Sequence, residues 1–278
     1  LNQCMQSIFE QEHQDFEVIV IDDASTDNSY EVCQKWGRKF DRFVLRRNSI
    51  NVGLVNNWNE CIAAAQGQWI KFVFQDDYLE VNCLSDFLNE VEPGVPLICS
   101  KRNYVDERSN PVRSVERIKQ FREFFTQNRI QPEDMISEII RLINVNIFGE
   151  PTSVFFRRSL ITTIGFFNPY LKQLCDYEYW LRIALNFPIK YLDKSLTNFR
   201  IHHDSMSTKN QHGVYPAYID PIIILHDLLY DKKYGHFRKI LGKRNRQELK
   251  QAYRNRLFAL HYKIDIEHID CQEYKDLE

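Results

Sequence analysis

The sequence predicts an α/β fold, with a mostly parallel sheet covered by helices on both faces and a helical C-terminal appendage. Two observations carry this prediction. Apolar strand-like runs alternate with segments of helical periodicity from residue 1 to residue 105. Two of the runs, 16–21 and 70–74, each end in a pair of adjacent aspartates. The 278 residues are enough for one large domain and an appendage.

Composition excludes several classes of protein. The net charge of −2 argues against a generic nucleic-acid binder, so no nucleic-acid partner is expected. The seven cysteines are scattered and contain no C-x-x-C pair, which favours a reducing cytosol over a disulfide framework or a zinc cage. The longest apolar run, near 221–225, is far short of a membrane span, and we see no signal peptide. We therefore expect a cytoplasmic protein, peripheral at most to the inner face of the membrane.

The first half alternates regularly between the two kinds of element. Helices are expected where apolar residues recur at helical spacing, and Asp27 is a candidate N-cap for the second of them. Strands are expected in the apolar runs between the helices. The predicted order is helix 1–11, strand 16–21, a helix after Asp27, strand 43–46, helix 54–65, strand 70–74, helix 83–91 and strand 95–104.

The second half is less regular. Residues 106–131 are polar and basic without periodicity, which predicts an excursion at the edge of the site. The expected elements after it are helix 132–145, strand 152–156, helices 159–165 and 176–187, and strands 188–192 and 196–202. From residue 208 the composition changes, and 208–278 is predicted to be a helical extension that starts with helix 218–230.

The paired aspartates suggest a binding site. Asp22 and Asp23 follow one strand, and Asp76 and Asp77 follow another. Parallel strands would bring the four carboxylates to one rim of the sheet, where open α/β sheets bind ligands. Carboxylates suit Mg²⁺ or Mn²⁺, which commonly share phosphate ligands. Taken singly, each pair is equally consistent with a solvated acidic turn.

Four motifs in the right order resemble family 2 glycosyltransferases of the GT-A fold. They are residues 16–29, with the pattern F-E-V-I-V-I-D-D-x-S-x-D-x-S; Asn51, Gly53 and Asn56, which resemble the N-x-G-x-x-x-N element; residues 65–70, A-x-G-x-W-I; and residues 74–77, which lie at the family's D-x-D region. The resemblance covers 1–207, with 1–105 as the nucleotide-binding half and 106–207 as the acceptor half. It also implies that the family's first strand would lie before Leu1.

This resemblance implies a metal-dependent, inverting transfer of a sugar from a nucleotide-sugar donor, with a UDP-sugar favoured, to an acceptor hydroxyl in surface polysaccharide synthesis. Asp22, Asp23, Asn51 and Asn56 are expected at the donor, with Asp23 on the base. For Asp22 the alternative is a turn cap that accepts backbone N–H groups.

The expected cofactor is Mn²⁺ or Mg²⁺. The resemblance places Asp76 on the ribose and Asp77 on the metal, although Phe74 stands where the strict pattern has its first acid. His202 resembles the histidine of the family's Y-R-x-H ending and is expected on the metal or the diphosphate, with a purely structural role as the alternative. Arg200 is expected to neutralise phosphate or to pair with a carboxylate.

Residues 174–182 resemble the family's E-D-x-E-x-W-x-x-R element, with Cys175 in place of the first acid. Asp176 is the expected general base, and N-capping of its helix is the alternative. Glu178 should point to another side of the helix, which makes it a poorer base.

Residues 232–256 carry ten Lys or Arg against one Glu. They predict either a membrane-surface contact or a solvated face balanced by the acidic tail. The expected acceptor is a glycan or a lipid-linked glycan. Two other functions stay open. A nucleotidyltransferase would normally show a Gly-rich basic loop, and an inactive nucleotide-sugar-binding domain would lose the base.

Overall fold

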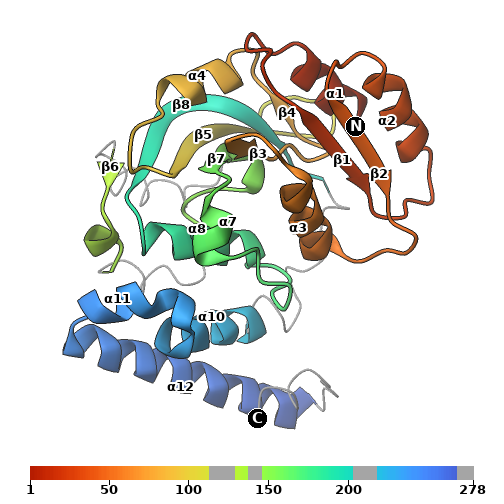
Figure 1. Cartoon of the computed structure of the whole chain (residues 1–278). Coiled ribbons are helices and arrows are strands. Elements are labelled where there is room, and N and C mark those ends of the chain that lie inside the picture. The colour runs from red at the N-terminus through yellow and green to blue at the C-terminus, as the bar shows by residue number, and fades with distance from the viewer. Residues whose placement is uncertain (113–128, 137–145, 203–217, 268–278) are drawn as a thin grey trace.

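A computed structural model describes the backbone of residues 1–112, 129–136, 146–202 and 218–267 (Figure 1). Strands occupy the centre of the molecule, and three helices of the C-terminal part lie beneath them in this view. The expected α/β class with a helical C-terminal appendage is confirmed.

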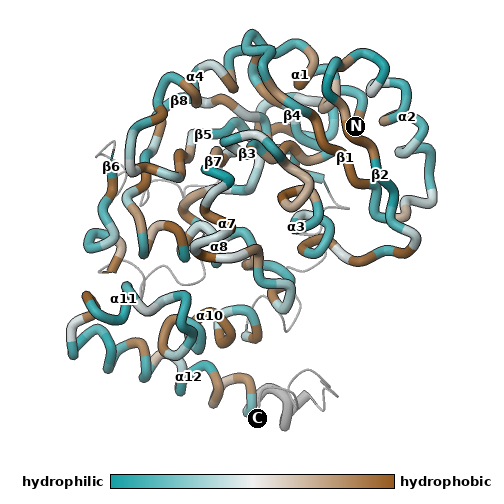
Figure 2. The backbone as a smooth tube through the Cα atoms, in the orientation of Figure 1, coloured by the Kyte–Doolittle hydropathy of each residue, from teal (hydrophilic) through white to brown (hydrophobic). Residues whose placement is uncertain are grey.

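Residues 1–64 are built as the sequence predicts, whereas the predicted strand 70–74 is shorter and covers Trp69–Lys71. α1 (Asn2–Phe9), α2 (Ser29–Gly37) and α3 (Leu54–Ala64) alternate with two strands. These strands, β1 (Val18–Asp22) and β2 (Phe43–Arg47), pair in parallel with Val18 opposite Phe43. β1 is hydrophobic along its length (Figure 2), which fits a strand between layers of helices.

The remaining strands form a six-stranded sheet. Its members are β3 (Trp69–Lys71), β4 (Tyr78–Leu79), β5 (Leu97–Val105), β6 (Arg129–Ile130), β7 (Val154–Arg157) and β8 (Ile189–Arg200). The order is β3-β7-β5-β8-β4, and β6 also pairs with β8. Only β5 and β8 run parallel among these described strands. The sheet is therefore mixed, and the expectation of a mostly parallel sheet was wrong in this respect.

Two local features explain that difference. β4 and β6 are two-residue strands that pair antiparallel with β8, and an antiparallel neighbour needs no crossover helix. Two predicted strands, 188–192 and 196–202, are one strand, β8. Between them Asp193 and Lys194 interrupt the register against Ser100 and Lys101 as a bulge, so the polar pair does not end the strand.

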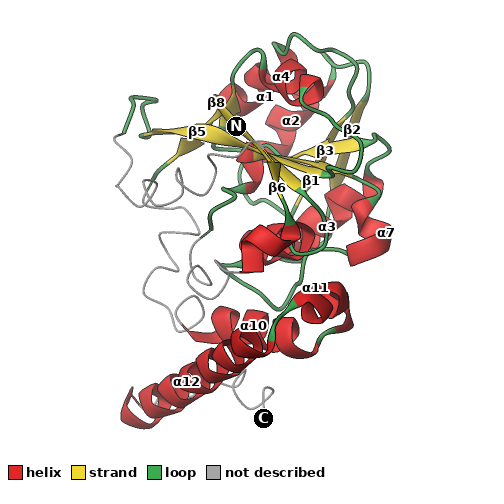
Figure 3. Ribbon diagram, turned by 90° about the vertical axis from the view of Figure 1, so that its left-hand side faces the viewer, coloured by secondary structure: helices red, strands yellow, loops and turns green. Residues whose placement is uncertain are grey.

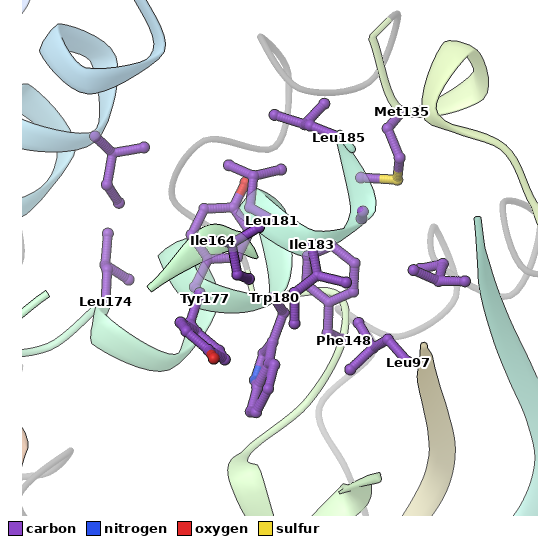
Figure 4. Close-up of a cluster of buried hydrophobic side chains, with 14 of the residues drawn as sticks. Leu97, Met135, Phe148, Ile164, Leu174, Tyr177, Trp180, Leu181, Ile183 and Leu185 are labelled. Carbon is purple, nitrogen blue, oxygen red and sulfur yellow. The ribbon is translucent and has the colours of Figure 1, made fainter. Parts of the chain in front are cut away.

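Helices cover both faces of the strands (Figure 3). α1, α2 and α4 (Cys83–Asn89) lie on one side, and α3 and α7 (Leu160–Ile164) lie on the other. α8 (Cys175–Ala184) sits at the centre of the main apolar core, where Tyr177, Trp180 and Leu181 are buried. Figure 4 shows these side chains beside Phe148 and Leu97.

The C-terminal helices share that core. α10 (Asp220–Tyr230) and α12 (Lys243–Glu267) contribute buried leucines to the same cluster, and α11 (Gly235–Ile240) contributes Phe237. Of the short 3₁₀ turns at Pro151–Ser153 and Lys232–Tyr234, the second adds Tyr234. The predicted boundary between 207 and 208 lies outside the described residues, as do 113–128 of the polar excursion and 137–145 of a predicted helix. In the described part of the chain, every helix is too short or too polar to cross a membrane.

Candidate active site

The carboxylate of Asp22, at the end of β1, is committed to the turn that follows. It is buried, accepts from the Ser25 backbone N–H at 3.2 Å, and pairs with Arg47 Nε at 3.1 Å. This is the turn-capping geometry given above as the alternative to donor binding. The turn itself places Ala24 at φ 58°, in the left-handed region that L-residues rarely adopt.

Asp23 fastens the end of β1 to the loop that begins α3. Its carboxylate accepts from the backbone N–H groups of Val52 at 2.8 Å and Gly53 at 3.0 Å, and from the Asn48 side chain at 3.0 Å. Gly53 has φ +85°, so the loop needs a residue that tolerates the left-handed region.

Asn51 and Asn56 hold the same loop. The Asn51 side chain donates to the Asp23 carbonyl at 3.1 Å, and the Asn56 side chain donates to the Val52 carbonyl at 2.9 Å. Because a carboxylate oxygen can accept a second hydrogen bond, Asp23 keeps acceptor capacity beyond these contacts. Its predicted contact with the base stays a prediction.

Asp76 and His202 form a partly exposed pair. Asp76 Oδ2 lies 2.8 Å from His202 Nε2, and the two side chains are 27% and 22% exposed. They come from residues 126 positions apart, because the end of β8 returns beside the segment that precedes β4. An imidazole nitrogen and a carboxylate oxygen thus point at one another at the surface of the site.

Asp77 lies behind that pair and is almost fully buried, with 1% of its surface exposed. One oxygen accepts from the Thr152 hydroxyl, and the other accepts from the Arg200 backbone N–H at 3.0 Å. Burial raises the pKa of Asp77 to about 7, although both hydrogen bonds act in the opposite direction. Asp77 therefore joins three chain segments, those around Asp76, Thr152 and the end of β8.

Arg200 braces the Asp76 segment rather than projecting into open space. Its guanidinium donates to the carbonyls of Asp76 at 2.8 Å and Asp106 at 2.7 Å, and to the Gln3 side chain at 2.6 Å. A further bond reaches the Ser109 hydroxyl at 3.2 Å. The predicted contact of Arg200 with phosphate stays a prediction, and the structure gives this side chain a clear positioning role.

Asp176 opens α8 and lies half-buried beside the loop that precedes β7. Its Oδ2 accepts from Asn146 Nδ2 at 2.9 Å, and its Oδ1 accepts from the Tyr177 backbone N–H at 2.7 Å. Burial raises the pKa of Asp176 to about 7, and the nearby charge of Glu150 adds to the increase. The bond from Tyr177 and the charge of Arg102 only partly oppose it.

The loop 146–152 contacts both Asp77 and Asp176. This role of the loop was not recognised from the sequence. Asn146 contacts Asp176, whereas Thr152 contacts Asp77. Between them Glu150 forms an ion pair with Arg102 of β5 and raises the pKa of both Asp77 and Asp176. The available signal was the Gly-Glu-Pro triplet at 149–151, in which an acid sits at a forced turn before a strand.

Lys71 of β3 supports this loop from beneath. Its ammonium group donates to the Thr152 carbonyl and lies 5.5 Å from the centre of the Phe87 ring. Burial lowers the pKa of Lys71 to about 8. The carbonyl contact holds Thr152, whose hydroxyl in turn holds Asp77.

The comparisons with known proteins agree with this architecture. Residues 1–162 match the family model described as glycosyl transferase family 2. The chain belongs to this family. An uncharacterised protein of Mycobacterium tuberculosis, MT1568, is 31% identical over 199 residues, which are 71% of this chain and 61% of that protein. This glycosyltransferase chain therefore spans less than two thirds of that relative.

Other relatives have names that state an activity. The Escherichia coli protein WfaP, named as a UDP-Glc:α-D-GlcNAc-diphosphoundecaprenol β-1,3-glucosyltransferase, is 26% identical over 73% of this chain and 72% of its own. The Staphylococcus aureus TarS fragment solved with UDP-GlcNAc has a TM-score of 0.64 and 19% identity, and the match covers 99% of this chain and 73% of that one. The mannosyltransferase PcManGT of Pyrobaculum calidifontis, solved with GDP-Man and Mn²⁺, has a TM-score of 0.55 at 14% identity, over 94% of this chain and 82% of that one. These structural similarities show the GT-A fold.

The donor atoms of this glycosyltransferase suit a hard or borderline divalent ion. Across the described residues, no group of three or more His, Cys, Asp or Glu side chains is arranged to hold a metal. The Asp76–His202 pair nevertheless offers the carboxylate and imidazole donors that Mn²⁺ accepts, and it is partly exposed. A bound diphosphate and water can complete such a shell, so the residues fit the ion.

Proposed function

We propose that this enzyme transfers a sugar from a UDP-sugar to an acceptor hydroxyl, with the aid of a divalent ion and with inversion at the anomeric carbon. The observation that carries the proposal is the state of Asp176. It is a half-buried carboxyl with its pKa raised to about 7, held in place by Asn146 at the start of α8. A carboxylate poised near neutral pH suits removal of the acceptor proton.

Asp76 and His202 would hold the Mn²⁺ or Mg²⁺, and Asp77 would support them from behind. The resemblance favoured Asp77 as the ligand, but its two oxygens accept from Thr152 and Arg200, whereas Asp76 is partly exposed. When bound, the ion supplies positive charge to the departing diphosphate. Asp76 and His202 also orient one another, because their nitrogen and oxygen lie within hydrogen-bonding distance.

The donor would lie between the end of β1 and the Asp76 segment. Asp23 and the Asn51 loop form a rigid rim there, with Asp22 and Asn56 fixing the turns on either side. A UDP-sugar is favoured because the TarS fragment is solved with UDP-GlcNAc and the WfaP name specifies UDP-Glc. The WfaP name also supports a glycan on a lipid diphosphate as the class of acceptor.

Inversion is expected because Asp176 acts as a base rather than as a nucleophile, and the other carboxylate of α8 is not open to the substrate. Asp176 accepts the proton while the acceptor oxygen attacks the anomeric carbon, and the bond to the diphosphate breaks in the same step. Glu178, two residues further along α8, is buried against Arg182 and is not available to the substrate. Nuclear magnetic resonance of the product would test this point, and a product with the donor's anomeric configuration would contradict the mechanism.

The donor is tested by thermal unfolding with UDP-, GDP- and dTDP-sugars, each with and without Mn²⁺. A ligand at about 100 times its Kd stabilises the folded state by about 2.7 kcal/mol. We expect this stabilisation from a UDP-sugar with Mn²⁺, and much less without the ion. If none of the nucleotide sugars raises the melting temperature, the proposed function is wrong.

The metal assignment has a matched control in the chain. Asp76→Asn and His202→Gln should each raise the Mn²⁺ concentration needed for half-maximal activity by about tenfold or more. The His226–Asp227 pair of α10 has a similar separation of 3.1 Å, so His226→Gln should leave that concentration unchanged. If His202→Gln and His226→Gln change this Mn²⁺ concentration equally, the assignment of the ion to Asp76 and His202 is wrong.

A further inference from the structure

One ridge of α12 combines positive charge with exposed aromatic rings. Residues at every fourth position are exposed, three of them cationic and two aromatic: Arg246, Lys250, Arg254, Phe258 and Tyr262, called here the α12 row. Phe258 and Tyr262 are 73% and 61% exposed, which is unusual for rings of this size. The members span about 24 Å along the helix at 1.5 Å per residue.

The row winds from beside the buried side of α12, at Arg246, to the opposite side, at Phe258 and Tyr262. At about 100° per residue, all five members fall within a sector of about 160°, whereas Leu249 and Leu260 lie outside it. Leu249 and Leu260 are fully buried against the rest of the protein. In Figure 1, α10 and α11 lie between α12 and the strands, so α12 forms the outer layer. Figure 2 shows α12 as largely hydrophilic, with hydrophobic residues toward its end.

The positive charges of the row lack acidic partners within the described part of the chain. Arg246 donates to the Arg238 carbonyl at 3.0 Å, and no described carboxylate pairs with Lys250 or Arg254. The one described acid within this stretch of the helix, Glu248, bonds to Arg244. Like charges four residues apart repel one another on a helix, so an anionic partner would relieve a cost that the free protein carries.

A hollow adjoins the row. It has a volume of about 280 Å³ and lies between α10, α11 and α12, lined by Leu229, Tyr230, Arg238, Leu241, Arg246 and Lys250. Two of the cations belong to the α12 row, and the leucines give the hollow an apolar wall. A phosphate with an attached hydrocarbon chain matches this combination of groups.

We propose that the α12 row docks the enzyme on an anionic lipid surface, with lipid phosphates at Arg246, Lys250 and Arg254 and the rings of Phe258 and Tyr262 in the headgroup layer. Cations and amphipathic aromatic rings on one helix face are the groups that hold a helix in a membrane interface. A polyanionic glycan would use the cations but would give the two rings no apolar medium to enter. The proposal is independent of the chemistry at Asp176, since adsorption needs no donor or acceptor.

The experiment measures sedimentation of the full chain with vesicles of phosphatidylcholine alone, or with about one third phosphatidylglycerol. We expect binding to the anionic vesicles only, weakened by salt because exposed charges are screened. Each cation near an anionic surface contributes about fivefold to partitioning, so Arg246→Gln/Lys250→Gln/Arg254→Gln should reduce it about 100-fold. Phe258→Gln/Tyr262→Gln keeps the charge and should reduce it about tenfold.

A control variant removes three exposed cations elsewhere. Lys35→Gln/Arg38→Gln/Arg46→Gln gives the same net charge and should keep nearly all of the vesicle binding. Circular dichroism and thermal unfolding check that each variant is folded. The proposal is overturned if wild type does not bind anionic vesicles, or if both triple variants lose binding equally. Unchanged binding after loss of the two rings, or full displacement by inorganic phosphate, would reduce the row to a general anion site and overturn the membrane assignment.

Discussion

Two carboxylates on α8, only two residues apart, have opposite environments. Asp176 is half-buried beside the loop 146–152 and has its pKa raised to about 7. Glu178 is 2% exposed and meets two strong donors. Its oxygens accept from Arg182 Nη2 at 2.9 Å and from the Tyr234 hydroxyl at 2.6 Å.

The Glu178 side of the helix is a closed network. Arg182, itself fully buried, also donates to the carbonyls of Ile164 and Phe166, at 2.5 Å and 2.9 Å. Tyr234 belongs to the C-terminal helices, so the network fastens them to α8. Asp220, at the start of α10, accepts from the backbone N–H groups of Lys172, Gln173 and Leu174 and adds a second attachment.

The difference teaches how to separate a structural acid from one available for chemistry. Glu178 has a full positive charge as its partner, whereas Asp176 has one amide and one backbone N–H. Burial without a full counter-charge raises a carboxyl pKa, and a base needs a pKa near the working pH. The C-terminal helices therefore stabilise the helix that carries the proposed base, without contributing to its chemistry.

The largest effect expected is on turnover. Asp176→Asn keeps the size of the side chain and removes the base, so kcat should fall by about 10²–10⁴-fold. Affinity for the donor, measured by calorimetry, should stay within about twofold because the base acts on the acceptor. Asp41→Asn, on an exposed turn, is the control and should retain full turnover.

The same variant should change stability in the opposite direction. A carboxyl whose folded pKa is raised stabilises the protein fully below its unfolded pKa, and this contribution is lost as pH rises through about 7. Asp176→Asn should therefore melt at or above the wild-type temperature at pH 8. Loss of both turnover and melting temperature would indicate a structural role for Asp176 and contradict the assignment.

Glu178→Gln should give the second-largest effect, and on stability. It leaves the buried Arg182 without a counter-charge, a change that costs about 3–5 kcal/mol of unfolding free energy. Urea denaturation measures the loss. Arg244 and Glu248 form a pair with the same spacing and the same 2.9 Å distance, but their side chains are 90% and 44% exposed. Glu248→Gln should cost less than about 1 kcal/mol, and equal costs would show that burial is not the cause.

Local patterns in the sequence predicted most of the fold. Helical spacing placed α1, α3 and α10, because each buries one face more than the other, and it also placed α8, which is buried on nearly all sides. Strand direction was not predictable in the same way. Whether β7 runs parallel or antiparallel depends on which neighbours it meets, and its partners β3 and β5 are more than 50 residues away in the sequence.

The site was predictable in its residue types and less so in their contacts. Asp22 and Asp23 lie at the end of β1 and Asp176 at the start of α8, as expected. Asp76 and Asp77 do not directly follow a strand as predicted, because β3 ends at Lys71, and β1 and β3 belong to different sheets. What the sequence could not reveal is which oxygens the protein itself uses. Asp23 accepts from the backbone of a distant loop and Asp77 from the backbone at the end of β8, whereas Asp76, beside Asp77, contacts His202. Asn146 was missed because a single asparagine in a loop has no pattern to mark it.

The smallest predicted effect isolates that asparagine. Asn146→Asp keeps the acceptor oxygen for the N–H groups of Phe148 and Gly149 but replaces the donor to Asp176 with a second acid. Two neighbouring carboxyls resist joint ionisation, so the pKa of Asp176 should rise further above 7. The acid limb of the pH profile of kcat/KM should therefore shift to higher pH by about one unit, while the maximum value of kcat/KM stays nearly unchanged.

Asn59→Asp provides the comparison for this variant. Asn59 also accepts from a backbone N–H and donates to a backbone carbonyl, both of Phe167 and both at 3.0 Å. The side-chain amide that donates to Asp176 is that of Asn146, so Asn59 serves as the control. Asn59→Asp should leave the acid limb of the kcat/KM profile at its wild-type pH, even if the variant changes the melting temperature. If Asn146→Asp lowers kcat/KM equally at every pH, then Asn146 only shapes its loop, and the raised pKa of Asp176 does not govern the reaction. If Asn146→Asp shifts the acid limb and Asn59→Asp does not, then proton transfer depends on Asp176, the carboxylate of α8 that no buried cation neutralises.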